Sequence, residues 1–117
     1  MRRYRRGEVW LANLDPVIGS EQGKTRPVVI LQNDVANEFS PVVIVAAITG
    51  MSGPKVYPTE VRVRAREGGL KKESLILLNQ IRTIDKRRLV QRWGSLQPAT
   101  VEGMNEALKI SLGLVPL

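Results

Sequence analysis

The chain has 117 residues and a mass of 13.0 kDa, a length at which one domain with one hydrophobic core is expected. Hydrophobic residues make up 43% and charged residues 25% of the sequence, so the chain is too apolar to be intrinsically disordered. It contains no cysteine and no histidine, which excludes disulfides, Cys or His zinc sites, Ser-His-Asp triads and histidine acid–base pairs. Eighteen Lys and Arg residues against eleven Asp and Glu residues give a formal charge of +7, which favours a polyanionic partner such as nucleic acid.

The first half of the chain carries the pattern of three strands. Residues 7–14 are rich in branched and aromatic side chains and stop at an Asp-Pro turn signal, which predicts a strand. A loop is expected over 15–25, because this segment is longer than a tight hairpin needs. Two apolar runs, 27–32 and 42–49, predict strands with both faces covered, and these form the buried centre of a sheet.

The second half predicts shorter strands and turns. The segment 50–58 contains two glycines and two prolines and is expected to be a connector. Residues 59–66 alternate apolar and charged side chains, which predicts a half-exposed strand. After a Gly-Gly turn, 74–78 predicts another apolar strand, 85–88 a helical turn and 89–93 one more short strand.

The C-terminal segment has a different period. Apolar residues recur from Val101 to Val115 at steps of three and four, with polar residues between them, which predicts an amphipathic helix. Pro98 suits the first turn of this helix, and Gln97 is a weak N-cap.

Five or six short strands followed by one late helix predict a mainly β fold, a small and strongly bent antiparallel barrel with the helix over an open side. We find no internal repeat or linker, so residues 1–117 are treated as a single domain. No window approaches the roughly 18 apolar residues of a membrane span, and no long apolar segment follows the N-terminal arginines as an export signal requires. A soluble cytoplasmic protein is therefore expected.

Basic residues gather in an N-terminal arm, on the charged side of 59–66, and in a patch between Lys71 and Arg92. Twelve of the eighteen are arginine, whose planar fork binds phosphate at two points. A solvated surface explains any single one, but the collective excess favours phosphate contacts. Aromatic residues are only 4%, which argues against a base-stacking sheet surface. Trp10 and Trp93 are expected in the core or an interface, and Phe39 is the best candidate for stacking on a base.

The segment 19–27 combines two glycines, which let backbone amides approach an anion closely, with Arg26, which enters a buried strand. A guanidinium held in this way would stabilise negative charge. The competing interpretation is a structural arginine at the start of a strand. Thr49 adds a hydroxyl at the end of the apolar strand 42–49.

Several motifs together resemble the MazF/PemK family of bacterial toxin endoribonucleases. In chain order they are Arg6-Gly7-Glu8-Val9, Val17 to Gly23 leading to Arg26-Pro27-Val28-Val29, Gln32-Asn33-Asp34, Val45 to Thr49, Leu77 to Lys86, and Glu106-Ala107-Leu108. The resemblance therefore covers nearly the whole chain, with its motifs in order.

This resemblance implies an SH3-like barrel, a homodimer, cleavage of single-stranded RNA without a metal or other cofactor, and an acidic cognate antitoxin that blocks the site. By motif position, the family's catalytic arginine and threonine fall on Arg26 and Thr49. Residues that the resemblance associates with RNA binding or its support are Ser20, Glu21, Gln22, Asn33 and Gln80, to which we add Arg6 and Phe39.

Cleavage without a metal uses the ribose 2′-hydroxyl as internal nucleophile and gives a 2′,3′-cyclic phosphate and a 5′-hydroxyl. Glu21 is the only carboxylate in the motif loop and is our hypothetical general base, although a structural ion pair with Arg26 explains this carboxylate at least as well. Two other functions stay open. One is a noncatalytic toxin of similar fold that acts on a protein such as DNA gyrase, and the other is a basic barrel that binds nucleic acid and leaves it intact.

Overall fold

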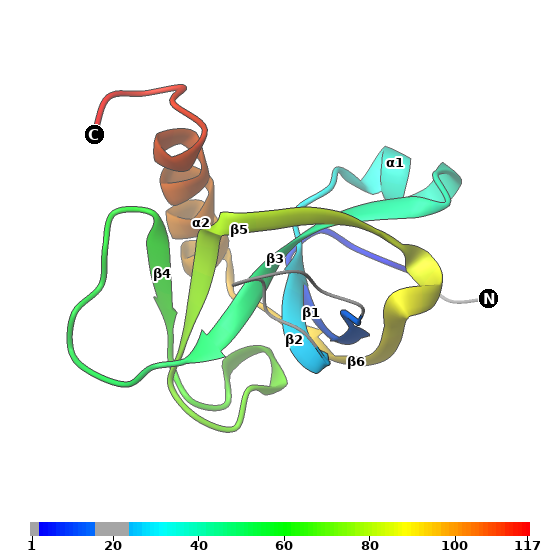
Figure 1. The fold of residues 1–117 in the computed structure, drawn as a ribbon, viewed down its shortest axis with the longest axis horizontal. Coiled ribbons are helices and arrows are strands. Elements are labelled where there is room, and N and C mark those ends of the chain that lie inside the picture. Colours follow the sequence, from blue (N-terminus) through cyan, green and yellow to red (C-terminus); the bar gives the residue numbers. More distant parts are fainter. Residues whose placement is uncertain (1–2, 16–23) are drawn as a thin grey trace.

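The structure is a computed structural model that describes residues 3–15 and 24–117. Within these residues it contains six strands, two α-helices and two short 3-10 helices (Figure 1). The elements in chain order are β1 (Glu8–Asn13), β2 (Thr25–Ile30), α1 (Asp34–Phe39), β3 (Val42–Gly50), β4 (Glu60–Val63), η1 (Glu67–Gly69), β5 (Ser74–Asp85), η2 (Lys86–Arg88), β6 (Leu89–Ser95) and α2 (Pro98–Ser111).

The strands form one antiparallel sheet with the order β4-β5-β3-β2-β1-β6. The twelve-residue strand β5 pairs with β3 along its length and with β4 at its start. Its register against β3 shifts between Ala46, which faces Ile81, and Ala47, which faces Leu77. Extra residues of this kind bend a strand and increase its twist, so the sheet curls without closing. The predicted bent, barrel-like antiparallel fold with a C-terminal helix is confirmed, as an open sheet.

Each face of the sheet buries its own apolar cluster because successive side chains of a strand point to opposite faces. One cluster lies between the sheet and α2 and includes Val9, Val29, Ala46, Ile48, Val63, Ile76, Leu78, Met104 and Ala107. The other lies on the opposite face and includes Trp10, Ala12, Leu14, Val28, Ile30, Val43, Val45, Ile84 and Leu89. The prediction that the 27–32 run is covered on both faces is therefore confirmed, whereas Val42 and Ile44 at the start of β3 are exposed.

Helix α2 packs its apolar side on the sheet (Figure 1). Met104 and Ala107 are buried, and the hydroxyl of Ser111 donates to the carbonyl oxygen of Leu78 at 2.6 Å. Gln97 makes no side-chain cap, as its residue type predicts. The helix ends at Ser111, four residues before the predicted stripe ends. Neither α-helix of the described part has the length and apolar character that a membrane crossing requires.

The structure differs from the sequence prediction at one missed helix and at two strand boundaries. The segment 33–41 contains the helix α1, which begins after the N-cap Asn33, whose side chain accepts from the backbone N–H of Ala36 at 2.9 Å. The strand expected over 59–66 is shorter, since β4 ends at Val63 and the chain turns at Arg66, whose φ is 80°. The strand expected over 74–78 continues to Asp85. The predicted helical turn and last strand are confirmed as η2 and β6.

Candidate active site

Arg26 and Thr49 lie on one face of the sheet, on the neighbouring strands β2 and β3. The two strands are paired from Ile30 opposite Val45 to Val28 opposite Ala47. Arg26 lies two residues before Val28 on β2, and Thr49 lies two residues after Ala47 on β3. Because side chains two residues apart on a strand point to the same face, Arg26 and Thr49 both share the face of the Val28 and Ala47 pair. Backbone pairing between β2 and β3 stops next to Pro27, which has no N–H to donate, while β2 stays paired with β1 through Thr25.

The two side chains differ in accessibility. Arg26 is exposed and Thr49 is half-buried. Strand β2 is held from the other side by β1, where Ala12 is opposite Arg26 and is fully buried. Thr49 is opposite Leu75 of β5, which is only 9% exposed. A guanidinium and a hydroxyl thus stand on a rigid sheet, which is the support that preorganised donors need.

The other predicted site residues fall into three groups. Ser20, Glu21 and Gln22 lie outside the described residues. Asn33 caps α1 through its side-chain oxygen, and Gln80 lies where β5 departs from its regular register against β3. Phe39, the last residue of α1, is 78% exposed. This exposure leaves its ring accessible, while stacking on a base stays a prediction.

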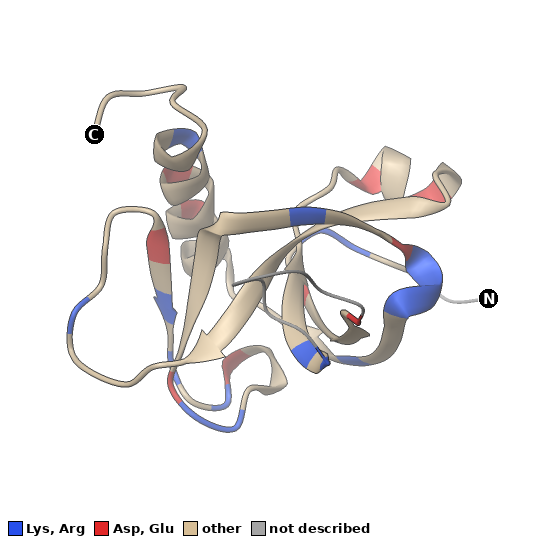
Figure 2. Ribbon diagram, viewed as in Figure 1, with Lys and Arg blue, Asp and Glu red and all other residues tan. Residues whose placement is uncertain are grey.

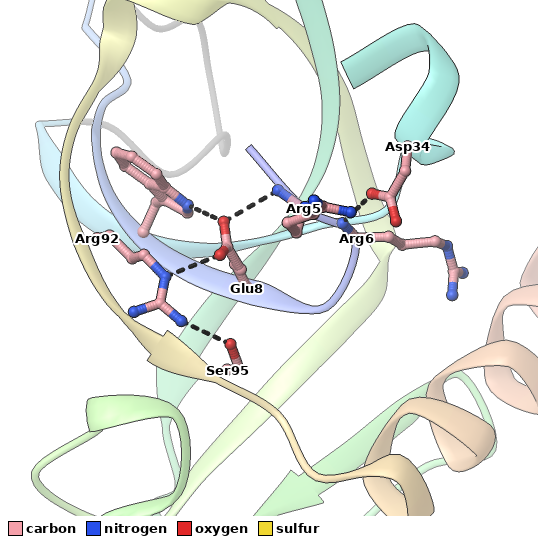
Figure 3. Close-up of polar contacts among 7 residues, drawn as sticks. Arg5, Arg6, Glu8, Asp34, Arg92 and Ser95 are labelled. Carbon is pink, nitrogen blue, oxygen red and sulfur yellow. Dashed lines mark hydrogen bonds and ion pairs between the residues drawn. The ribbon is translucent and has the colours of Figure 1, made fainter. Parts of the chain in front are cut away.

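Arg6 is engaged in the fold. Its Nε donates to the carbonyl oxygen of Leu31 at 2.7 Å, and its Nη2 donates to Oδ1 of Asn105 on α2 at 2.7 Å. Its backbone N–H donates to Asp34 at 2.7 Å (Figure 3). That bond is the main reason that the pKa of Asp34 lies below its usual value of 3.8. These contacts give Arg6 a structural role that requires no RNA.

Glu8 is the centre of a second polar cluster in the same N-terminal motif (Figure 3). Its side chain is buried, and Oε1 accepts from the backbone N–H of Arg5 at 2.9 Å and from Nε1 of Trp10 at 3.0 Å. Oε2 accepts from Nε of Arg92 on β6 at 2.8 Å, and Arg92 also donates to the hydroxyl of Ser95. The motif resemblance pointed to this segment, but its carboxylate serves the fold.

Basic segments lie at both ends of the sheet (Figure 2). At the end near the N-terminus, a hollow of about 250 Å³ is lined by Arg3, Tyr4, Arg5, Asp34, Asn37, Glu38 and Lys86. The Tyr4 ring packs against the Trp10 ring with centroids 4.9 Å apart, and Nζ of Lys86 lies 5.4 Å from the Tyr4 centroid. Two carboxylates share this hollow with the three cations, so it is only weakly positive.

Two arginines outside the predicted site share the face of Arg26 and Thr49. Arg82 is opposite Val45, and its Nη1 is buried with no hydrogen-bond partner in the described part of the chain. Arg62 of β4 is opposite Leu75, which is itself opposite Thr49. Only the strand register reveals these positions, because nothing in the spacing of 49, 62 and 82 predicts a shared face.

Comparison with known proteins gives consistent matches over nearly the whole chain. The family model described as "PemK-like, MazF-like toxin of type II toxin-antitoxin system" matches residues 5–112. Endoribonuclease EndoA of Bacillus subtilis (strain 168) is 49% identical over 111 residues, which are 95% of this chain and 96% of that protein. The toxin MazF-mt6 of Mycobacterium tuberculosis is 28% identical, with a TM-score of 0.77 over 93% of this chain and 99% of that chain. MazF from Deinococcus radiodurans shares the fold, with a TM-score of 0.82 and 24% identity over 97% of this chain and 99% of that chain.

Proposed function

The chain belongs to the PemK-like, MazF-like toxins of type II toxin-antitoxin systems, and we propose that this endoribonuclease toxin cuts single-stranded RNA at selected sequences without a metal ion. The observation that carries the proposal is the common sheet face of Arg26 and Thr49, at corresponding positions of β2 and β3. A cation and a hydroxyl on one face provide two donors that stabilise the negative charge of a phosphorane.

The reaction is a transesterification in which the downstream RNA fragment is the leaving group. The 2′-oxygen of the ribose attacks the adjacent phosphorus and its proton goes to a base. The bond from phosphorus to the 5′-oxygen then breaks, and the 5′-oxygen takes up a proton from the protonated base or from water. The products are a 2′,3′-cyclic phosphate and a 5′-hydroxyl. Because the substrate supplies its own nucleophile, the protein has to align three atoms and stabilise the added negative charge.

Arg26 stabilises that charge, and Thr49 donates a hydrogen bond to a nonbridging oxygen. Loss of one preorganised donor costs on the order of 10² to 10³ in rate, so Arg26→Ala and Thr49→Val should each lose that much cleavage while keeping the fold. Matched controls are Arg87→Ala, an arginine 90% exposed on η2, and Thr83→Val, an exposed threonine of β5. Wild-type rates in either folded site variant would remove that residue from the catalytic site.

Proton transfer is assigned to Glu21, which lies outside the described residues. An arginine side chain stays protonated near neutral pH and is poorly suited to accept the 2′-proton. A pH–rate profile of Glu21→Gln tests this role, because loss of the base should remove the acidic limb of the wild-type profile. An unchanged profile would leave Glu21 as a structural partner only.

RNA binding is assigned to Ser20, Gln22, Asn33 and Gln80, with Phe39 offering an exposed ring to a base. A-form duplexes hide base edges from side chains, so sequence preference requires unpaired bases. Annealing the target to its complement should therefore suppress cleavage, and equal cutting of both forms would contradict the assignment.

Partners follow from the family. We propose that the chain acts in the cytoplasm as a homodimer and that an acidic antitoxin covers its basic surface, since the formal charge of +7 favours a partner of opposite sign. Size-exclusion chromatography with light scattering tests the dimer, and a monomer under conditions that support cleavage would refute it.

One assay tests the proposal against its alternatives. The purified protein is incubated with a long single-stranded RNA in excess chelator, and the cut sites and end groups are mapped. Metal-independent, sequence-biased cuts with cyclic phosphate ends are expected. Intact RNA that is bound in a salt-dependent manner would identify a binding barrel, and intact, unbound RNA would favour a toxin that acts on a protein.

A further inference from the structure

Arg62 stands in one transverse row of the sheet with the proposed catalytic pair. Thr49 of β3 is opposite Leu75 of β5, and Leu75 is opposite Arg62 of β4. Residues that are directly opposite on antiparallel strands project from the same face. Arg62 therefore shares the face of Thr49, two strands away, at a backbone distance of about 10 Å.

Two further arginines continue from Arg62 along the chain. Arg62, Arg64 and Arg66 line an open hollow of about 540 Å³ at the β4 edge of the sheet, together with Ala65, Glu67, Gln97 and Thr100. All three arginines are exposed. Figure 2 shows this basic stretch along β4 and the turn that follows, at the end of the sheet opposite the N-terminal arm.

Two carboxylates, Glu67 and Glu73, lie beside the three arginines, so the cluster keeps a small net positive charge. Glu67 accepts a hydrogen bond from the backbone N–H of Gln97 at 3.0 Å. Glu73 pairs with Nη2 of Arg62 at 2.6 Å, with side chains 45% and 51% exposed respectively. An ion pair between two half-exposed groups contributes little, so a phosphate can take the place of Glu73 without a large cost.

We propose that Arg62 and Arg64 bind backbone phosphates of the RNA strand as it leaves the Arg26 and Thr49 site. These two arginines and Arg66, which lies at the far end, form a surface that we call the phosphate track. This inference rests on the proposed ribonuclease function and adds to it the path of the flanking RNA. At about 3.4 Å per stacked nucleotide, about three nucleotides span the roughly 10 Å between Thr49 and Arg62, so the contacted phosphates lie about three nucleotides from the cut step.

Phosphate contacts fix the position of a strand without reading its bases. The track should therefore change affinity and salt dependence and leave the cut sequence unchanged. It should also act only on RNA that is long enough to reach β4. These two properties separate a phosphate track from a catalytic or base-reading role.

The test uses the full chain and two RNAs around a mapped cut site. The short RNA ends about two nucleotides from the cut on each side and is therefore too short to reach Arg62, and the long RNA has about 15 nucleotides. The test variant is Arg62→Gln combined with Arg64→Gln. Its control is Arg87→Gln combined with Lys109→Gln, which removes two exposed, ion-paired cations elsewhere. Glu73→Gln releases Arg62 from its ion pair, and Glu106→Gln, which breaks the Lys109 pair on α2, is its control.

For the long RNA, the test variant should raise KM about tenfold with kcat unchanged, and each lost contact should lower the slope of log K against log salt by about 0.7. Glu73→Gln should bind a long RNA with 2′-deoxyribose at the cut more tightly than Glu106→Gln does. The short RNA should be cut equally by the test variant and the wild-type protein. Equal losses with both RNAs, or an equal loss in the control variant, would overturn the track.

Failure of the proposed function gives a different result, because the wild-type protein would then cut neither RNA. If the test variant cuts long RNA normally but binds an acidic polypeptide more weakly, the cluster is an antitoxin contact and the RNA track is refuted.

Discussion

Glu8 provides the most direct test of how the N-terminal motif supports the fold. Its buried carboxylate joins the N-terminal arm, β1 and β6 through the Arg5 backbone, Trp10 and Arg92. We expect Glu8→Ala to lower the free energy of unfolding by about 3 kcal/mol. The bond from Trp10, itself 4% exposed, accounts for about 2 kcal/mol because it joins a buried donor to a charged acceptor.

The other two donors add less. Arg5 is exposed and the Arg92 side chain is 48% exposed, so both can turn to water when the carboxylate is removed, at about 0.5 kcal/mol each. Glu8→Gln retains the shape and one acceptor oxygen but turns an amide NH₂ towards one set of donors. It should cost about 1 to 2 kcal/mol.

The assay is urea denaturation at fixed protein concentration, followed by fluorescence, in an Arg26→Ala background that we expect to lack toxicity. In a parallel thermal unfolding experiment, a loss of about 3 kcal/mol should lower Tm by about 10 °C for a chain of this size. The control is Glu106→Ala, whose side chain is 67% exposed and pairs with Lys109, and it should cost less than about 0.5 kcal/mol. If Glu8→Ala costs no more than this control, the polar cluster does not hold the sheet edge together.

Three further changes test other parts of the structure. The side chain and backbone N–H of Arg87 lower the pKa of Asp85 from 3.8 to about 2, so this carboxylate stabilises the fold above pH 3.8 and loses that effect as the pH falls towards 2. Asp85→Asn should therefore flatten the decline of Tm between those values, and an unaltered pH profile would contradict the linkage. Gly69 has φ 78° and a built Cβ would lie 2.4 Å from the carbonyl oxygen of Trp93, so Gly69→Ala should lower the free energy of unfolding by about 3 kcal/mol in urea, whereas an unchanged midpoint would exclude strain. Arg82→Met replaces a buried donor that has no partner in the described part of the chain, and calorimetry should show a gain of about 1 to 3 kcal/mol; a loss would reveal a partner for that guanidinium.

The central strands could be predicted because their apolar runs are long enough to carry a signal. Residues 27–32 and 42–49 correspond to β2 and β3 within two residues at each boundary. The helix α1 has only six residues, too few for a helical period to appear in the sequence. Its stability comes from side-chain hydrogen bonds, one of which is a tertiary contact in which Nζ of Lys86 donates to the carbonyl oxygen of Asn37. Asn37 donates to the carbonyl oxygen of Gln32 at 2.8 Å and accepts from its Nε2 at 3.1 Å, and both side chains are buried.

In the candidate site, too, some features could be predicted from local sequence and others depend on long-range pairing. Arg26 and Thr49 were found through motif position, and the register then placed them on one face. Glu8 and Arg92 are 84 residues apart and form a buried contact that no local pattern predicts. Arg62 reads in the sequence as one charge of an alternating strand, and only the pairing of β4 with β5 relates it to Thr49. Local periodicity therefore gives the face of a strand, and long-range register gives the site.

The register shift in β5 explains why simple alternation fails there. Before the shift Leu77 is opposite Ala47, and after it Ile81 is opposite Ala46, so three residues of β5 stand between positions that are adjacent on β3. Because three is an odd number, the alternation of side chains along β5 is inverted at the shift. Odd-numbered residues before the shift therefore point to one face of the sheet, and odd-numbered residues after it point to the other. Leu75 and Leu77 therefore share the face of Thr49, while Ile81 packs in the cluster under α2. Removing one residue between Ser74 and Leu77 would move either the row of Thr49, Leu75 and Arg62 or the core residues of β5 to the opposite face of the sheet. The candidate site and the core therefore depend on the same strand register.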